Sequence, residues 1–162
     1  MSVPFNKLFN VRSCIKLIQT RRSLREGTIK VGIVGSRTYE NKDKIKEMIF
    51  MLKQKLGNVE IVSGGATHGA DKYAKKFALE LGLEYSEFNP AYTSKNLYSV
   101  MPIEYYDQPY HISQLMHRNE LIVMYADQVI IFRSAGESNG SDHVLKMCKK
   151  HNKPFVIIGD KI

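Results

Sequence analysis

Residues 29–35 read Ile-Lys-Val-Gly-Ile-Val-Gly, a short and mainly apolar run that passes directly into the polar residues Ser36 and Arg37. A run of this length that ends in glycine predicts a buried β-strand. Over residues 40–56 the apolar side chains recur at helical spacing, and Gly57 stands where a helix is expected to end. This part of the chain therefore begins with a strand followed by a helix.

The same alternation continues to the end of the chain. Residues 59–63 and 83–88 have the pattern of further strands, and residues 70–81 have that of a helix. The remaining expected elements are a helix over 112–125, a strand over 128–132, a loop over 134–141, a helix over 142–151 and a strand over 154–158. Strands that alternate with helices need crossover connections, which place helices on both faces of a parallel sheet. We therefore predict an α/β fold with a doubly wound, mostly parallel Rossmann-like sheet.

The composition is typical of a folded protein and not of a disordered, fibrous or membrane-spanning one. Of the 162 residues, 43% are hydrophobic and 25% are charged. No apolar run reaches the roughly 20 residues that cross a bilayer. The two cysteines cannot by themselves form a disulfide framework or a four-ligand zinc site, and no segment resembles a secretory signal. We expect a cytoplasmic protein in a reducing compartment, with no membrane span.

The positive charge of the chain is concentrated at its N-terminus. The net charge is +8, but residues 1–30 contain seven basic residues and one acidic residue, so that the rest of the chain contributes only +2. We therefore divide the chain into a basic, amphipathic, helical N-terminal arm, residues 1–28, and a domain, residues 29–162. The arm could pack on the domain, bind an acidic partner or a membrane surface, act as a transit peptide, or contact nucleic acid; binding of nucleic acid by the domain itself is not favoured.

Three loops that follow predicted strands are rich in glycine and in hydrogen-bond donors. They span residues 35–38, 63–71 and 138–141. In a parallel α/β sheet such loops meet at the carboxyl ends of the strands, where amides at helix starts favour anions. The pattern indicates a site for a phosphorylated ligand. The Gly-x-Gly-x-x-Gly and Gly-x-x-x-x-Gly-Lys-Ser/Thr motifs are both missing from the sequence, which argues against an ordinary dinucleotide dehydrogenase or ATPase.

One long segment, residues 90–111, has no helical or strand pattern. It contains three prolines and five of the nine tyrosines of the chain. A connection of this length in a compact domain is usually functional, so we expect a lid or an interface. Its tyrosines could stack on a base, or the segment could simply pack on the sheet.

The order of the motifs resembles that of the YspA-like group of the SLOG superfamily, which takes its name from the SMF/DprA proteins and the LOG phosphoribohydrolases. The resemblance covers about residues 29–158 and leaves out the arm. It is carried by Val-Gly-Ile-Val-Gly-Ser-Arg37, Val-Ser-Gly-Gly-Ala-Thr-His-Gly-Ala-Asp71, Asn-Pro-Ala-Tyr92, Arg118-Asn119, Ala126-Asp127 and Asn-Gly-Ser141.

The resemblance implies a Rossmann-like domain that binds a nucleotide or nucleotide-derived ligand, as a sensor or a sequestering module. The ligand-binding residues that it implies are Gly35, Ser36, Arg37, Ser63, Gly64, Gly65, Gly69, Ala70, Asp71, Arg118, Asn119, Asn139, Gly140 and Ser141. From the residues alone, two of these have simpler interpretations. Asp71 could serve only the helix dipole and cap neighbouring amides, and Arg118 could be a solvated arginine on an amphipathic helix.

Two further functions follow from the same resemblance. LOG enzymes hydrolyse the N-glycosidic bond of nucleoside monophosphates, and Met116-His117-Arg118 is similar to their arginine motif, which makes Arg118 the candidate catalytic residue. The position of their glutamate is occupied by Val144, although Asp142 or Glu137 could replace it. Binding of single-stranded DNA, as in DprA-like proteins, is the other alternative. A homo-oligomer is compatible with the fold class, and we expect no metal site because the histidines and carboxylates lack ligand spacing.

Overall fold

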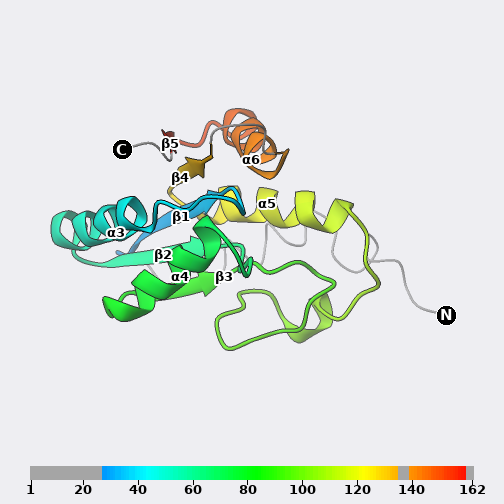
Figure 1. Ribbon diagram of the computed structural model, residues 1–162. Coiled ribbons are helices and arrows are strands. Elements are labelled where there is room, and N and C mark those ends of the chain that lie inside the picture. Colours follow the sequence, from blue (N-terminus) through cyan, green and yellow to red (C-terminus); the bar gives the residue numbers. More distant parts are fainter. Residues whose placement is uncertain (1–26, 135–138, 160–162) are drawn as a thin grey trace.

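A five-stranded, all-parallel sheet forms the centre of the molecule (Figure 1). The structure is a computed structural model and describes residues 27–134 and 139–159. The strand order is β3-β2-β1-β4-β5. The strands are β1 (Ile29–Gly35), β2 (Val59–Ser63), β3 (Glu84–Glu87), β4 (Gln128–Arg133) and β5 (Phe155–Gly159). The chain crosses from one half of the sheet to the other between β3 and β4, so that the switch in strand order lies between β1 and β4.

Helices cover both faces of the sheet, as the alternation of elements predicts. The helices are α3 (Lys42–Leu56), α4 (Ala70–Glu80), α5 (Ser113–Tyr125) and α6 (Asn139–Lys150), with a short 3-10 helix η1 (Ile103–Tyr105) before α5. One core cluster joins α3 and α4 to the sheet, and the other joins α5 and α6 to its opposite face. The predicted doubly wound fold is therefore confirmed, with a sheet that is parallel throughout.

Successive residues of the central strands pack on opposite faces. In β1, Ile33 belongs to the cluster with α3 and α4, and Val34 belongs to the cluster with α5 and α6. In β4, Ile131 and Phe132 alternate in the same way. Because both faces are covered, the middle parts of β1 and β4 are apolar at successive positions rather than at every second position.

The predicted element boundaries are correct to within a few residues. In α3 the side chain of Asn41 accepts a hydrogen bond from the amide of Lys44, and Gly57 ends the helix with a φ of +74°. The largest difference is at α6, which begins at Asn139 and not at residue 142. The residues Asn139, Gly140 and Ser141 favour turns, which is why the sequence predicts a loop there. They are also well tolerated at the start of a helix.

The segment between β3 and α5 packs largely against the core. Phe88, Met101, Tyr105 and Tyr106 are buried in the cluster that includes α5. Of the two interpretations of this tyrosine-rich segment, packing is thus correct for Tyr105 and Tyr106. Tyr110, by contrast, is exposed.

Several sequence-based expectations fall on parts of the chain that are not described. Residues 1–26 of the predicted helical arm lie outside the described residues, and so do Glu137 and Ser138. Within the described residues, none of the helices combines the length and the apolar character that a membrane span requires.

Candidate ligand-binding site

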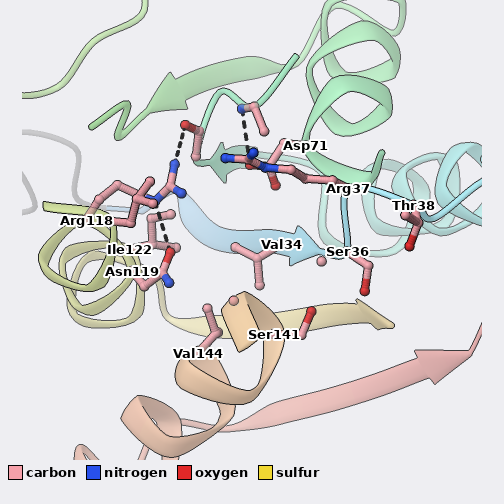
Figure 2. Close-up of a pocket in the computed structure, with 15 residues that line it drawn as sticks. Val34, Ser36, Arg37, Thr38, Asp71, Arg118, Asn119, Ile122, Ser141 and Val144 are labelled. Atoms are coloured by element: carbon pink, nitrogen blue, oxygen red, sulfur yellow. Dashed lines mark hydrogen bonds between the residues drawn. The ribbon is translucent and has the colours of Figure 1, made fainter. Parts of the chain in front are cut away.

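A cavity of about 380 Å³ lies at the carboxyl ends of the strands, next to β1 (Figure 2). Its wall is formed by residues from β1, from the loops after β1 and β2, and from α4, α5 and α6. The lining residues are Val34, Gly35, Ser36, Arg37, Thr38, Gly64, Ala66, Asp71, Leu115, Arg118, Asn119, Ile122, Gly140, Ser141 and Val144. The cavity is therefore at the edge where parallel α/β sheets bind their ligands.

Most of the residues that the sequence analysis predicts to bind the ligand line this one cavity. Nine of the fourteen line it: Gly35, Ser36, Arg37, Gly64, Asp71, Arg118, Asn119, Gly140 and Ser141. Gly65 lines a smaller neighbouring cavity. Ser63, Gly69 and Ala70 are buried and do not line either cavity, and Asn139 begins α6.

The side chain of Arg118 crosses from α5 to the loop after β2. Its Nη1 donates to the carbonyl oxygen of Gly64 at 2.6 Å, and its Nε donates to Oδ1 of Asn119 at 2.9 Å. The residue is only 9% exposed, so the interpretation of Arg118 as a solvated surface arginine is wrong. Burial lowers the pKa of Arg118 below its ordinary value, and the negative charge of Asp71 opposes this effect.

Asp71 is the buried carboxylate of the cavity. Its Oδ2 accepts a hydrogen bond from the amide of Ala66 at 3.2 Å, which ties the start of α4 to the loop after β2. Burial raises the pKa of Asp71, while Arg118 and then the amide of Ala66 act in the opposite direction. The interpretation of Asp71 as a cap for a neighbouring amide therefore holds for the amide of Ala66, and the same side chain also lines the cavity.

Two glycines in the loops permit this close packing. A Cβ atom on Gly64 would lie 2.4 Å from Nη1 of Arg118, so that no larger residue fits beneath the guanidinium. Gly69 has a φ of +73°, and a Cβ there would lie 2.2 Å from the carbonyl oxygen of Ser36. That same carbonyl accepts a hydrogen bond from the amide of Ala70, so this amide joins two loops and is already engaged within the protein.

The first turn of α6 faces the cavity from the other side. Ser141 is buried there, and Gly140 also lines the cavity. The hydroxyl of Ser36 accepts a hydrogen bond from the amide of Ser134 at 3.2 Å, which links the ends of β1 and β4. The amides of the first helical turn have no partner within a helix, and together with the helix dipole they favour an anion.

Apart from Val144, which the resemblance to the LOG enzymes already placed at the site, sequence reasoning missed the apolar part of the wall. Val34, Leu115, Ile122 and Val144 line the cavity, and Figure 2 shows Ile122 and Val144 on the side of α5 and α6. For Leu115 and Ile122 the helical spacing indicates only that the side chains face inward, which is also true of core residues. The nearby His143 contacts Asn119 at 3.4 Å between ring Nδ1 and amide Nδ2, and its position next to the site could not be read from the sequence.

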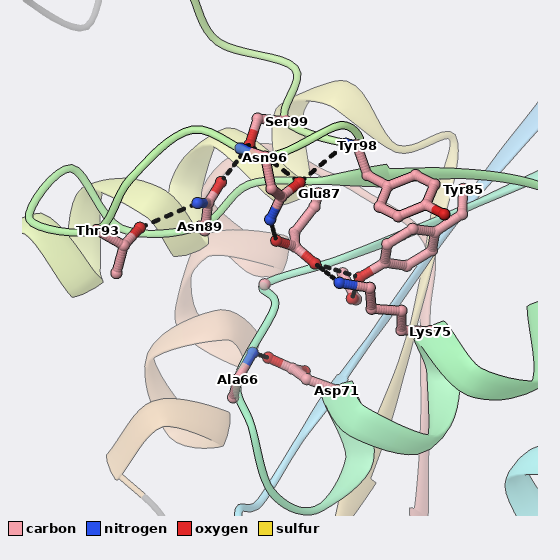
Figure 3. A network of polar contacts seen from close by, with 12 residues as sticks. Ala66, Asp71, Lys75, Tyr85, Glu87, Asn89, Thr93, Asn96, Tyr98 and Ser99 are labelled. Carbon is pink, nitrogen blue, oxygen red and sulfur yellow. Dashed lines mark hydrogen bonds and ion pairs between the residues drawn. The ribbon is translucent and has the colours of Figure 1, made fainter. Parts of the chain in front are cut away.

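A second missed residue is the buried Glu87, at the end of β3 (Figure 3). Its carboxylate accepts hydrogen bonds from the hydroxyl of Tyr85, at 2.9 Å, and from the amide group of Asn96, and it lies 3.4 Å from the ammonium group of Lys75. A Cβ on Gly65 would lie 2.4 Å from Cδ of Glu87. The carboxylate therefore packs directly against the loop that lines the site. Ser63 belongs to the same network, since its hydroxyl lies 2.6 Å from that of Tyr85.

With the fold and the site described, the chain can be compared with known proteins. The family model of the circularly permuted YpsA SLOG family matches residues 61–161. The chain belongs to this SLOG family. The expectation of a SLOG domain is thus confirmed. No curated protein matches the chain.

Two solved structures share the fold of this SLOG domain. One is the molybdenum cofactor binding protein from Rippkaea orientalis, with 16% identity, a TM-score of 0.60, and coverage of 83% of this chain and 78% of that one. The other is the molybdenum cofactor carrier protein MCP from Chlamydomonas reinhardtii, with 17% identity, a TM-score of 0.57, and coverage of 80% and 76%. At this level of identity the comparison shows a common fold.

In this SLOG domain the residue that corresponds to the LOG glutamate is Val144, which belongs to the apolar wall of the cavity. Val144 lines the cavity and is 2% exposed. Asp142, a candidate replacement, is exposed and lies 3.0 Å from the guanidinium of Arg133, and it is not among the residues that line the cavity. Among the described lining residues, Asp71 on α4 is the only carboxylate.

Proposed function

We propose that this SLOG domain binds a nucleotide or nucleotide-derived phosphorylated ligand in the 380 Å³ cavity, as a sensor or sequestering module. One observation carries the proposal: Arg37, Arg118 and the first turn of α6 converge on a single cavity that also has an apolar wall. A volume of this size is in the usual range for small-molecule sites, which begins at about 300 Å³.

The charges in the cavity orient the ligand. Asp71 carries the negative charge of the cavity wall and would repel a phosphate. The phosphate therefore lies away from Asp71, between Ser36 and the first turn of α6 with Ser141. Arg37 is exposed, so its guanidinium can move onto the phosphate and make paired hydrogen bonds.

The remaining part of the ligand lies along the apolar wall. Leu115, Ile122 and Val144 offer the surface on which a flat ring packs. Asp71 then accepts hydrogen bonds from sugar hydroxyls, and Asn119 can donate to or accept from a polar edge of the ring. This arrangement uses both the polar and the apolar lining residues.

The fold comparison supports the ligand class. The two proteins of similar fold are named for binding or carrying the molybdenum cofactor, a nucleotide-derived ligand. Our proposal for this chain is the wider class of phosphorylated nucleotide derivatives. Neither alternative function is favoured by a described feature, because the LOG glutamate position holds Val144 and DNA binding depends on the arm.

The first experiment identifies the ligand. Mass spectrometry of small molecules released by denaturing the purified protein is expected to show a phosphorylated nucleotide derivative. Titration calorimetry with AMP then measures affinity for a defined member of this class. Arg37→Ala should weaken binding about 10- to 100-fold, since a charge-assisted hydrogen bond contributes about 1.5–3 kcal/mol. Arg133→Ala removes an arginine that does not line the cavity and serves as the matched control.

Ser141→Ala tests the α6 end of the cavity separately, and we expect a smaller loss because the serine is uncharged. Unchanged affinity in both Arg37→Ala and Ser141→Ala would place the nucleotide outside this cavity. If nucleotides do not bind and no phosphorylated molecule is released, the proposed function is wrong.

A further inference from the structure

Glu87 is a buried acidic residue that lines neither the larger cavity nor its smaller neighbour, although it lies directly beneath the loop after β2 (Figure 3). It is the last residue of β3 and is only 2% exposed. Burial of a carboxylate is costly unless the group is paired and hydrogen-bonded. The contacts of Glu87 show which parts of the fold this buried group holds together.

Glu87 joins the end of β3 to α4 and to the long segment before α5. Its carboxylate forms the ion pair with Lys75 of α4, at 3.4 Å, and accepts the hydrogen bond from the amide group of Asn96. Its backbone amide donates to the carbonyl oxygen of Tyr98 at 2.9 Å, and its carbonyl oxygen accepts from the amide of Val100 at 3.1 Å. The carboxylate is therefore held from several sides and cannot turn freely.

Lys75 can lose this partner without leaving a buried charge. Its Nζ lies 5.2 Å from the ring centroid of Tyr98 and 5.9 Å from that of Tyr85, so two aromatic rings hold the ammonium group beside the carboxylate. The side chain is still 37% exposed. If Glu87 is replaced, the ammonium group can turn toward water, and the effect of the replacement then comes from the missing carboxylate.

The loop after β2 rests on this carboxylate. Gly65 has a φ of +73°, and a Cβ there would lie 2.4 Å from Cδ and 2.7 Å from Oε2 of Glu87, so that the backbone of the loop is in contact with the carboxylate. The end of β2 is attached to the same group, because the hydroxyl of Ser63 lies 2.6 Å from that of Tyr85, which donates to Glu87. Glu87 thus fixes both the start of the loop and its third residue.

Gly65 separates the two loop residues that hold the buried charged groups of the larger cavity. Before it, the carbonyl oxygen of Gly64 accepts the hydrogen bond from Arg118. After it, the amide of Ala66 donates to Asp71. Because each peptide group is a rigid plane, a displacement of Gly65 moves both of these contacts.

We propose that Glu87 is a positioning residue for the ligand: through Gly65 it holds the loop after β2 so that both buried charged groups keep their places in the larger cavity. Glu87 lines neither cavity and does not contact the ligand itself. This role rests on the proposed function, because the ligand is the nucleotide derivative of that proposal.

Two variants change the carboxylate by degrees, and titration calorimetry with AMP on the full chain measures the effect. Glu87→Ala removes the support beneath Gly65 and should weaken binding about ten-fold, the equivalent of one lost hydrogen bond in the site. Glu87→Gln keeps the shape and one acceptor oxygen, so it should restore most of the affinity and leave a loss of about three-fold. Glu80→Gln makes the same chemical change at an exposed carboxylate of α4 and should bind AMP like the wild type.

Two measurements separate positioning from a general loss of stability. Ile49→Ala removes a fully buried side chain of α3 that belongs to the core, and should lower the melting temperature without changing the affinity for AMP. Hydrogen exchange followed by NMR reports on the loop itself. The amide of Ala66 should exchange about ten-fold faster in Glu87→Ala than in the wild type, because its contact with Asp71 opens more often. In Ile49→Ala this amide should exchange at the wild-type rate.

The outcomes distinguish the positioning role from the proposed function. If both Glu87 variants bind AMP as tightly as the wild type, or if Ile49→Ala loses as much affinity as Glu87→Ala, the positioning role is wrong and the proposed function stands. Unchanged exchange of the Ala66 amide in both Glu87 variants would also overturn it. If the wild type binds no nucleotide, the proposed function fails, and the positioning role for a nucleotide fails with it.

Discussion

The guanidinium of Arg118 on α5 donates a 2.6 Å hydrogen bond to the backbone carbonyl of Gly64, a residue 54 positions earlier in the chain. This bond joins α5, on one face of the sheet, to the loop after β2, which leads into α4 on the opposite face. It also places a buried positive charge beside Asp71. The same arginine thus supports the shape of the cavity and sets its charge.

The first prediction concerns the stability that Arg118 provides. Arg118→Ala leaves the carbonyl of Gly64 and the carboxylate of Asp71 buried without this cation, so the free energy of unfolding should fall by about 2–4 kcal/mol. The free energy of unfolding is measured by urea denaturation, with circular dichroism as the signal. Arg133→Ala, which removes a more exposed ion pair, should cost less than about 1 kcal/mol. Equal effects of the two substitutions would contradict the structural role of Arg118.

The second prediction concerns the space beneath that arginine. Gly64→Ala places a methyl group 2.4 Å from Nη1 of Arg118 and 2.9 Å from Oδ2 of Asp71, so both side chains must shift. Such overpacking costs about 1–3 kcal/mol of unfolding free energy. The control is Gly159→Ala, because no atom lies within 4 Å of the added Cβ. A Gly64→Ala protein as stable as the wild type would show that the contact is looser than described.

The third prediction is a pH dependence at His117, the neighbour of Arg118. Burial lowers the pKa of His117 below its ordinary value of 6.5, and Glu120 opposes the effect. The unfolded chain therefore takes up a proton near pH 6.5, while the folded protein does so only at lower pH. The stability from neutral His117 is complete above pH 6.5 and is lost as the pH falls through the folded pKa.

The substitution His117→Gln should make this pH dependence weaker. Unfolding free energies at pH 5.5 and pH 7.5 test it, with His68→Gln, at an exposed histidine, as the control. The wild type should lose more stability between the two pH values than His117→Gln does. A parallel decline in the two proteins would mean that other groups cause the pH dependence.

The fourth prediction concerns hydrolysis. The α6 side of the cavity presents Val144, which can neither activate water nor stabilise a cationic sugar in a transition state. We expect no free adenine when AMP is incubated with the protein at high concentration and the mixture is analysed by chromatography. Release of adenine that disappears in Asp71→Asn would instead identify Asp71 as the catalytic carboxylate.

The amino-acid sequence by itself determined the order and type of the secondary structure elements. The apolar run at residues 29–35, the periodicity of α3 and the glycine at position 57 are local signals, and each predicted the observed element. The same glycine-rich loops also predicted the edge of the sheet at which the larger cavity lies. Where a local signal was ambiguous, as at Asn139 to Ser141, the predicted boundary was off by three residues.

Only the tertiary structure decided what the side chains do at that edge. Nothing near Arg118 in the sequence shows that it is buried against Gly64, or that Glu87 packs under Gly65. Likewise, the tyrosine-rich segment could have been a lid or a packed loop, and the structure buries Tyr105 but leaves Tyr92 beside a cavity. Local patterns encode backbone conformation, because that depends on near neighbours, whereas burial and charge pairing depend on residues that come together only when the sheet and its helices assemble.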